Sequence, residues 1–541
     1  MHKKASRPHL LAMAILLMLV SLTACSGSRG EEDAEYEDSR AVPAKARAQY
    51  SVAEEATPLE RAEGEPSSAE EYKRIDENEF MEAASHPLST FSIDVDSASY
   101  SNVRRFINDG QLPPKDAVRI EEMVNYFKYN YPQPTNSDPF TVSTELSTCP
   151  WNNSHKLALI GLQGKRISFD ELPPNNLVFL IDVSGSMDEP RKLPLLKSAF
   201  RMLADQLREN DRVAIVVYAG AAGLVLPSTP GSNKTEILKA IDSLQAGGST
   251  AGGEGIKLAY EIARNSFIQS GNNRVILATD GDFNVGVSSE GELVRLIEEK
   301  RKTGIYLTVL GFGTGNLKDS KMEQMADKGN GNYSYIDTIQ EARRVLAGEL
   351  GATLNTIAKD VKIQVEFNPA RVKSYRLIGY ENRLLRDEDF NDDKKDAGEL
   401  GAGHSVTALY EIIPTDGREV PAKVDPLKYQ NQDVKPEAFA SNEMMTVKLR
   451  YRPPSETTRH LIIQALADGD TEISSASENL KFAAAVAQFG LLLRDSKFKA
   501  KATFETCLDL ARQAKSSDDD GYRGEFIELV EKSRALARKG A

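Results

Sequence analysis

Cysteine and histidine are scarce in this sequence, which holds three cysteines and six histidines among 541 residues. Three cysteines cannot build a disulfide-rich scaffold, and no two of them have the CxxC spacing of zinc or redox sites. The histidines form no HExxH pair, and no serine stands in a GxSxG motif. Zinc-dependent and serine-based hydrolysis therefore have no support, and we do not expect an enzyme or a small-molecule substrate.

Basic residues are also outnumbered by acidic ones. The chain has 67 Lys and Arg residues and 80 Asp and Glu residues, which gives a net charge of −13. Residues 29–76 alone carry 14 acidic and 7 basic side chains. An acidic chain without a long Lys/Arg run is poorly suited to binding the phosphate backbone, so we expect no nucleic acid partner. Residues 26–76 also have few large apolar side chains, which predicts a disordered acidic tether.

The first 25 residues have the pattern of an export signal. A basic head precedes an apolar run, Leu10 to Leu22, that is too short to span a membrane comfortably. The run ends Leu22-Thr23-Ala24-Cys25, which resembles the lipobox of bacterial lipoproteins, whereas an ordinary secretory signal is the alternative. The resemblance implies a signal peptide over 1–25 and a lipid anchor on Cys25. Because Ser26 is not the aspartate that usually retains lipoproteins in an inner membrane, we expect an outer-membrane anchor facing the periplasm.

Hydrophobic periodicity organises the rest of the chain. From Leu177 to about Leu346, short apolar runs alternate with amphipathic helical stretches, which predicts a parallel sheet covered on both faces. Alternation of period two precedes this segment and returns at Val361, so the fold class we predict is α/β. It is a doubly wound parallel-sheet domain inserted in a β-rich body, with N-terminal and C-terminal helical segments. After the tether, the predicted divisions are an N-terminal region at 77–171, the α/β domain at 172–346, a β-rich domain at 347–455 and a helical region at 456–541.

Carboxylate and hydroxyl side chains follow the apolar runs of the α/β domain. One group follows the run that ends at Ile181, one residue lies on a glycine-rich loop before a helix, and one follows the run that ends at Thr279. Open α/β sheets place ligands at the carboxyl ends of their strands, and hard divalent cations prefer oxygen ligands. The sequence therefore predicts a metal site built from Asp182, Ser184, Ser186, Thr250 and Asp280.

With these residues in place, residues 172–346 resemble a von Willebrand factor type A (VWA) domain. The five candidates match its metal-ion-dependent adhesion site one by one, and Gly255 stands where the family has a glycine. Further motifs resemble bacterial YfbK-type lipoproteins and extend the resemblance over nearly everything after the tether. They are Phe91–Tyr100, Gln111–Pro114, Arg119–Met123 and Asn330–Asp337.

The resemblance implies a mechanism of recognition. Ser184, Ser186 and Thr250 would contact a divalent metal, most simply Mg²⁺ with Mn²⁺ or Ca²⁺ as alternatives, while Asp182 and Asp280 would help directly or through water. An Asp or Glu of a protein partner would then complete the metal. The expected function is that of a lipid-anchored cell-envelope binding protein, in which the membrane is reached through the lipid.

Other interpretations remain open. The chain could be a metal-independent scaffold of an envelope complex, or a metal-dependent hydrolase with His155 or Glu254 as its base. Cys149 and Cys507 could form a disulfide in an oxidising periplasm. Residues 94–99 echo a second acidic metal loop, but a strand end followed by a helix capped by Ser97 or Asp96 explains them better.

Overall fold

The computed structural model describes residues 70–540, apart from positions 95, 249–251, 282, 284–289, 350–354, 394, 396, 416–433, 455 and 516–517. The predicted lipidation site Cys25 and the predicted metal ligand Thr250 lie outside the described residues. Within the described residues, no helix is both long and apolar enough to cross a membrane.

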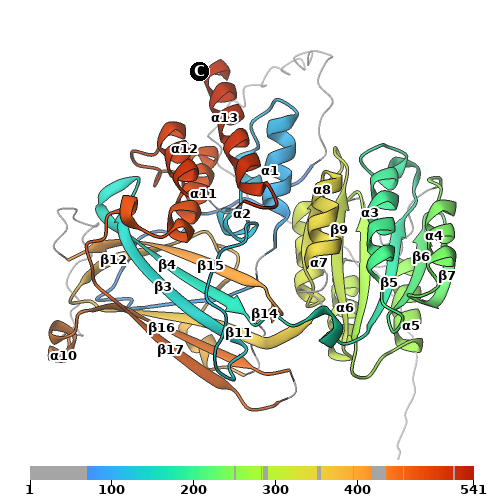
Figure 1. Cartoon of the computed structure of the whole chain (residues 1–541), viewed down its shortest axis with the longest axis horizontal. Helices are drawn as coiled ribbons and strands as arrows, with labels where there is room; N and C mark the ends of the chain where they lie inside the picture. Colours follow the sequence, from blue (N-terminus) through green and yellow to red (C-terminus); the bar gives the residue numbers. More distant parts are fainter. Residues whose placement is uncertain are drawn as a thin grey trace, which may run out of the picture. The chain divides into compact units, whose positions relative to one another are not determined.

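Two antiparallel sheets form a sandwich (Figure 1). The first has the strand order β1-β12-β15-β4-β3, and the second has the order β13-β2-β11-β16-β17 with β14 paired to β11. Each sheet combines strands that precede residue 172 with strands that follow residue 346, which confirms that the α/β domain is an insertion. The bounds are β1 Met81–Glu82, β2 Leu88–Ser92, β3 Phe140–Cys149, β4 Asn152–Gly164, β11 Thr356–Phe367, β12 Val372–Ile378, β13 Leu384–Leu385, β14 Gly398–Gly401, β15 Ser405–Pro414, β16 Glu443–Arg452 and β17 His460–Ala467.

Strand β4 shows how alternation in the sequence gives the first sheet two buried faces. Leu157 and Leu159 pack with the helices, whereas Ala158 and Ile160 pack in the core shared with the second sheet. Successive side chains of a strand point to opposite faces, so one strand serves both cores. The first sheet is therefore the middle layer between the second sheet and a helical layer.

The helical layer combines the two ends of the described chain. Helix α11 is buried on almost all sides, because it packs between the first sheet and its neighbouring helices. The segment 456–541, predicted as helical, begins instead with strand β17, whose two faces are largely exposed and so show no alternation. The bounds are α1 Ala98–Asn108, α2 Ile120–Asn125, α11 Glu478–Arg494, α12 Phe504–Gln513 and α13 Tyr522–Gly540.

The α/β domain is built on a sheet with the order β10-β9-β8-β5-β6-β7. Leu177, Phe179 and Ile181 of β5 pack on α3 and α4, while Val178 and Leu180 pack on the side of α5, α6 and α7. Both faces are therefore covered, as the doubly wound fold requires. The strands are β5 Asn175–Asp182, β6 Arg212–Tyr218, β7 Ala222–Pro230, β8 Asn272–Thr279, β9 Ile305–Phe312 and β10 Tyr333–Ile336. The helices are α3 Leu193–Gln206, α4 Lys234–Ser243, α5 Gly252–Asn265, α6 Glu290–Lys302, α7 Asp319–Lys328 and α8 Ile339–Ala342.

Two details of this part of the chain differ from the expectations. Strand β7 runs antiparallel to β6, so the sheet is mixed at that edge. Residues 70–76 contact the α/β domain, because the Glu71 N–H donates to the Leu317 carbonyl at 2.9 Å and the Gly315 N–H donates to Glu70 Oε1 at 2.9 Å. The Glu70 carboxylate also pairs with Arg105 of the N-terminal region at 2.8 Å. The predicted disordered tether is therefore wrong over 70–76.

The two described cysteines do not form the hypothesised disulfide. Cys149 and Cys507 are both buried and unpaired as thiols. The Cys507 thiol instead donates to the Ala485 carbonyl oxygen at 3.2 Å.

Candidate functional site

The chain of the α/β domain changes direction along its sheet between β5 and β8. From β5 it proceeds to β6 and β7 on one side, and it then returns to β8, β9 and β10 on the other. Such a switch point opens a crevice at the carboxyl ends of the two strands. Asp182 is the last residue of β5, and Asp280 directly follows β8, so the structure brings both predicted carboxylates to this crevice.

The turn after β5 gathers the first three candidate residues. The Ser184 N–H donates to Asp182 Oδ1 at 2.9 Å, and the hydroxyl oxygens of Ser184 and Ser186 lie 3.0 Å apart. Asp182 and Ser184 are buried, whereas Ser186 is exposed. The cluster therefore opens to solvent at Ser186.

The glycine-rich loop before α5 is held beside this turn by backbone bonds. The Gly247 N–H donates to the Val183 carbonyl at 2.7 Å, and the Gly185 N–H donates to the Gly248 carbonyl at 3.1 Å. Gly248 has a φ of +91°, a conformation that favours glycine. These bonds fix the loop as far as the last described residue before Thr250.

Lys192 is a buried cation beside the predicted site. Its ammonium donates to Asp280 Oδ2 at 3.1 Å and to the Ser186 carbonyl at 3.0 Å, and its side chain is 2% exposed. The other oxygen, Asp280 Oδ1, is buried and meets no hydrogen-bond donor among the described residues. Lys192 thus contacts Asp280 through one carboxylate oxygen. Among the described residues, the other oxygen lacks the hydrogen-bond donor that a buried carboxylate oxygen requires.

The local electrostatics favour a cation near Asp182. Burial raises the pKa of Asp182 above its usual value, and the Asp280 carboxylate adds to the rise, although hydrogen bonds from Ser184 oppose it. Asp182 Oδ2 also accepts hydrogen bonds from the Tyr218 hydroxyl at 3.1 Å and from the Thr279 hydroxyl at 3.3 Å. A positive charge between the Asp182 and Asp280 carboxylates would offset the cost of burying their negative charge.

The residues present fit a hard divalent cation. Two carboxylates and two hydroxyl groups form an all-oxygen donor set, which such cations prefer. The unsatisfied Asp280 Oδ1 supplies an oxygen with no competing bond among the described residues, and exposed Ser186 marks a path to solvent.

Three neighbours of the cluster were not singled out from the sequence. Tyr218 ends β6 and is paired in register with Asp182, so its place at the end of the neighbouring apolar run was a usable signal. Thr279 precedes Asp280 and offered the same signal. Lys192 gave none, because it lies in a turn six residues beyond Ser186, and only the folded chain brings it to Asp280.

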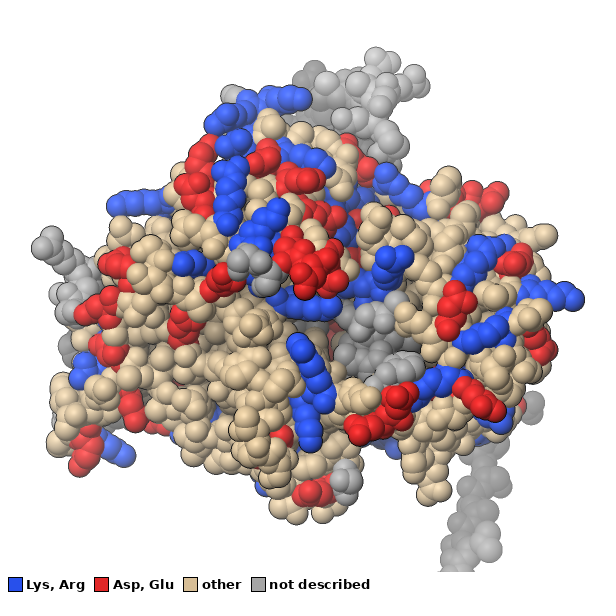
Figure 2. Space-filling model, viewed as in Figure 1, with Lys and Arg blue, Asp and Glu red and all other residues tan. Residues whose placement is uncertain are grey.

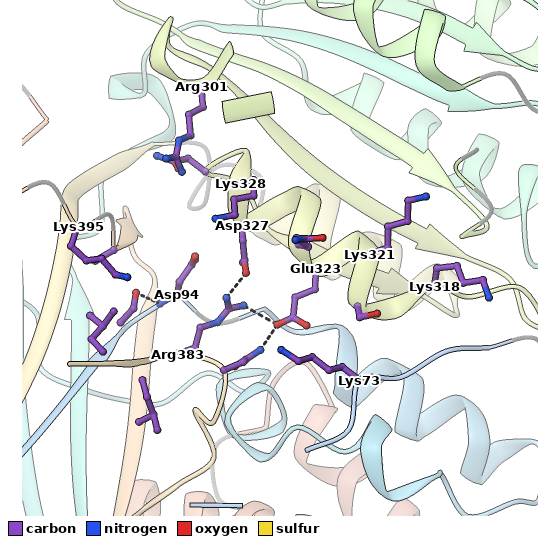
Figure 3. Close-up of a pocket in the computed structure, with 18 of the residues that line it drawn as sticks. Lys73, Asp94, Arg301, Lys318, Lys321, Glu323, Asp327, Lys328, Arg383 and Lys395 are labelled. Carbon is purple, nitrogen blue, oxygen red and sulfur yellow. Dashed lines mark hydrogen bonds and ion pairs between the residues drawn. The ribbon is translucent and has the colours of Figure 1, made fainter. Parts of the chain in front are cut away.

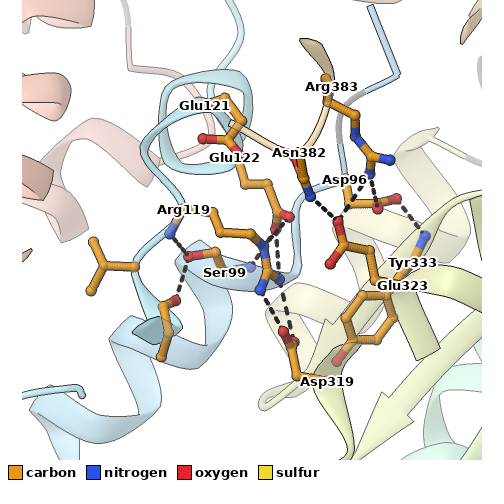
Figure 4. A network of polar contacts seen from close by, with 12 residues as sticks. Asp96, Ser99, Arg119, Glu121, Glu122, Asp319, Glu323, Tyr333, Asn382 and Arg383 are labelled. Atoms are coloured by element: carbon orange, nitrogen blue, oxygen red, sulfur yellow. Dashed lines mark hydrogen bonds and ion pairs between the residues drawn. The ribbon is translucent and has the colours of Figure 1, made fainter. Parts of the chain in front are cut away.

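A second group of buried carboxylates lies between α7 and the N-terminal region (Figure 4). Oxygens of Asp96, Glu122 and Glu323 lie within 4.8 Å of one another. Arg383 donates to Asp96 and to Glu323 at 3.2 Å each, and Arg119 pairs with Glu122. Guanidinium groups therefore already bind the carboxylate oxygens that a metal would use. We call this cluster of Asp96, Arg119, Glu122, Glu323 and Arg383 the ionic junction.

This junction also corrects the predicted helix cap. Ser97 stands at the N-cap of α1, but its side chain makes no capping bond and instead accepts from Arg344 at 2.8 Å. Asp96 Oδ1 accepts from the Tyr333 N–H of β10 at 2.7 Å. Both side chains are drawn away from the helix end because they join the N-terminal region to the α/β domain.

The two bases nominated for a hydrolase lie in different parts of the fold. His155 lies on β4 of the sandwich, where its Nδ1 and Glu411 Oε1 are 2.6 Å apart. Glu254 is exposed in the first turn of α5. The structure therefore does not bring the two nominated bases together.

Comparison with known protein families agrees with this fold. A model of the von Willebrand factor type A domain matches residues 176–346, and one described as von Willebrand factor matches residues 66–159. A third, described as "Uncharacterized protein YfbK, C-terminal", matches residues 352–536. The chain is therefore a VWA-domain protein, a class that generally mediates protein–protein interaction, often with a metal, and that is typically non-catalytic.

The relatives narrow the class to one family. The chain is 43% identical to YfbK of Escherichia coli strain K12 over 509 residues, which are 93% of this chain and 87% of that protein. The chain belongs to the YfbK family, as the sequence resemblance predicted.

More distant relatives share smaller parts. Inter-alpha-trypsin inhibitor heavy chain H3 of Homo sapiens is 26% identical over 257 residues, covering 44% of this chain and 28% of that protein. The solved structure of a von Willebrand factor type A protein from Catenulispora acidiphila is 17% identical, covers 74% of this chain and 91% of its own, and has a TM-score of 0.41.

Proposed function

We propose that this protein recognises a protein partner through a divalent metal held at the crevice of its VWA domain, where a carboxylate of the partner completes the metal. The observation that carries the proposal is the convergence of Asp182, Ser184, Ser186 and Asp280, with a buried Asp280 oxygen that meets no donor among the described residues. The proposed role is binding rather than catalysis.

Each residue has a distinct part in the proposal. Ser184, Ser186 and Thr250 would hold the cation through their hydroxyl groups, while Asp182 and Asp280 balance its charge directly or through water. Mg²⁺ is the first candidate, with Mn²⁺ or Ca²⁺ as alternatives, because all three accept oxygen ligands. When bound, the cation supplies an open coordination position for an Asp or Glu of the partner.

We further propose that the protein is attached to the cell envelope through a lipid on Cys25, on the outer membrane facing the periplasm. The support is the Leu22-Thr23-Ala24-Cys25 sequence at the end of a short apolar run. Labelling with a radioactive fatty acid tests the anchor: wild type should incorporate label, and Cys25→Ala should not. Label retained by the variant would refute it.

The recognition proposal is tested by capture of partners from an envelope extract with the full chain as bait. EDTA and Asp182→Ala should each abolish capture of the same protein, because both remove the metal. Asp188→Ala is the matched control, since this exposed aspartate lies in the same turn but outside the predicted ligand set. Capture that survives both treatments would refute the proposal and favour a metal-independent scaffold.

A further inference from the structure

A cavity of about 740 Å³ lies between α7 and the turn that follows β12 (Figure 3). Of its twenty lining residues seven are Lys or Arg and four are Asp or Glu, a local balance of +3 in a chain of net charge −13. The face seen in Figure 2, by contrast, shows acidic and basic side chains interspersed. We call this cavity the basic cleft.

Most acidic groups of the basic cleft already have cationic partners. Arg383 donates to Glu323 at 3.2 Å and also pairs with Asp327, and Lys318 lies 3.6 Å from Glu71. Two cations, Arg383 and Lys318, thus contact three of the four lining acids. The excess positive charge therefore belongs to side chains on the walls and rim.

Two of the wall cations are exposed lysines that make long ion pairs. Lys328 lies 3.6 Å from Glu298 with 43% of its side chain exposed, and Lys395 lies 4.0 Å from Asp389 with 47% exposed. The pair between Lys328 and Glu298 lies at the surface, where ion pairs contribute little, so Lys328 can exchange it for a ligand at small cost.

The spacing of the cations selects the kind of ligand. Lys321 and Lys328 are seven residues apart on α7, about 10 Å along the helix axis, and Lys395 lies on a separate segment. A single phosphate needs donors that converge on one point, whereas these charges suit several carboxylates along a chain. Among the described residues, no aromatic side chain lines the cleft to stack on nucleic acid bases, while exposed Leu384 offers an apolar contact to a peptide.

The cleft adjoins the chain segment that directly follows the predicted metal ligand Asp280. Gly281, directly after Asp280, is one of its lining residues, and the Lys321 ammonium donates to the Phe283 carbonyl of the same loop at 3.0 Å. We propose that the basic cleft binds an acidic polypeptide segment of the partner, the stretch that flanks the carboxylate at the metal. This inference deepens the proposed function and rests on it for the partner, but electrostatic binding by the cleft does not need the metal.

The test measures binding of a fluorescent oligoglutamate peptide to the full chain in EDTA by fluorescence anisotropy. Wild type should bind, with an affinity that falls as salt rises. Lys321→Glu/Lys328→Glu should weaken binding by roughly tenfold or more, because it reverses two wall charges. Lys239→Glu/Lys257→Glu is the matched control, since these lysines are exposed on α4 and α5 outside the cleft, and it should bind as wild type.

Each other outcome is decisive. Asp182→Ala should bind the peptide normally in EDTA, so failure of metal-dependent capture and failure of the cleft are distinguishable. Equal loss in both double variants, or no binding by wild type, would overturn the inference. Displacement of the peptide by millimolar inorganic phosphate, or preferential binding to phosphatidylglycerol vesicles, would also overturn it by assigning the cleft to a small anion or a lipid surface.

Discussion

Lys192 places a fixed positive charge inside the candidate metal site. Because it neutralises Asp280 within a buried cluster, Lys192→Met should leave that carboxylate uncompensated. Breaking a buried pair in this way costs about 3–5 kcal/mol of the free energy of unfolding. We expect the variant to unfold at lower denaturant concentration in EDTA, and to gain more stability from Mg²⁺ than wild type does.

Lys239→Met controls for the loss of a lysine, since Lys239 is exposed on α4. It should match wild type with and without Mg²⁺. An unchanged Mg²⁺ effect in Lys192→Met would contradict the role assigned to Lys192.

Glu323 should make stability fall as pH rises. Burial raises the pKa of Glu323 from 4.5 to about 7 despite the nearby Arg119 and Arg383. Between these values the folded state binds more protons at Glu323 than the unfolded state does, so its contribution to the free energy of unfolding declines with pH. Glu323→Gln lacks this contribution. Its free energy of unfolding should therefore rise by roughly 3 kcal/mol relative to that of wild type between pH 4.5 and 8.

Denaturant unfolding of both proteins across this pH range checks the prediction. The difference between the two proteins is the quantity to compare, because Glu121 and His404 also titrate and are present in both. The pKa of Glu121 is raised to about 7 by burial, and burial lowers that of His404 to about 4. A constant difference between Glu323→Gln and wild type would contradict the assignment.

Sequence could place Asp182, Ser184 and Asp280 because each follows an apolar run that had to become a buried strand. Their convergence then followed from the rule for parallel sheets. Lys192 and Arg383 could not be foreseen, because their partners lie 88 residues away at Asp280 and 287 residues away at Asp96. Pairs at such separations leave no periodic signal in one sequence.

At the scale of elements, Arg104 joins three helices. Its guanidinium donates from α1 to Asp337 at 2.8 Å, to Glu341 of α8 at 2.8 Å and to Glu525 of α13 at 3.0 Å. Arg104→Met would leave Asp337 and Glu341 buried with less compensation, so we expect a loss of about 3–5 kcal/mol in the free energy of unfolding. Arg104→Lys should recover part of it, because lysine restores the charge but not the fork of donors.

Denaturant unfolding measures this loss, and Arg512→Met is the control, since Arg512 makes an exposed pair with Glu531. The Mg²⁺ effect should persist in Arg104→Met, because the residue is not part of the candidate metal site. Equal stability of the two methionine variants would show that the ion pairs of Arg104 do not stabilise the packing of these helices.

Elements with a strong pattern were predictable, and those without one were not. The helix predicted to begin after Ser97 or Asp96 is α1, which spans Ala98–Asn108. Strand β17 was missed because Leu461 and Ile463 are exposed on an edge strand, which removes the alternation that a buried face imposes. The direction of β7 was missed because no local signal distinguishes an antiparallel edge from a parallel one.

At the scale of the molecule, the inserted arrangement was predictable because period-two alternation occurs on both sides of the α/β segment. The order of strands in the sandwich was not, since β2 pairs with β11 and β4 with β15 across the whole insertion. The ionic junction of Asp96, Arg119 and Arg383 also joins segments that only the complete fold brings together.

The most direct test of the account is a thermal melt of the full chain in Mg²⁺, in Mn²⁺ and in EDTA, beside Asp182→Ala and the control Asp188→Ala. A ligand that binds only the folded state adds about 2.7 kcal/mol at one hundred times its dissociation constant. We expect a higher Tm with metal in wild type and Asp188→Ala, and no change in Asp182→Ala. Identical curves in all conditions, or the same rise in Asp182→Ala, would contradict a metal site at the crevice.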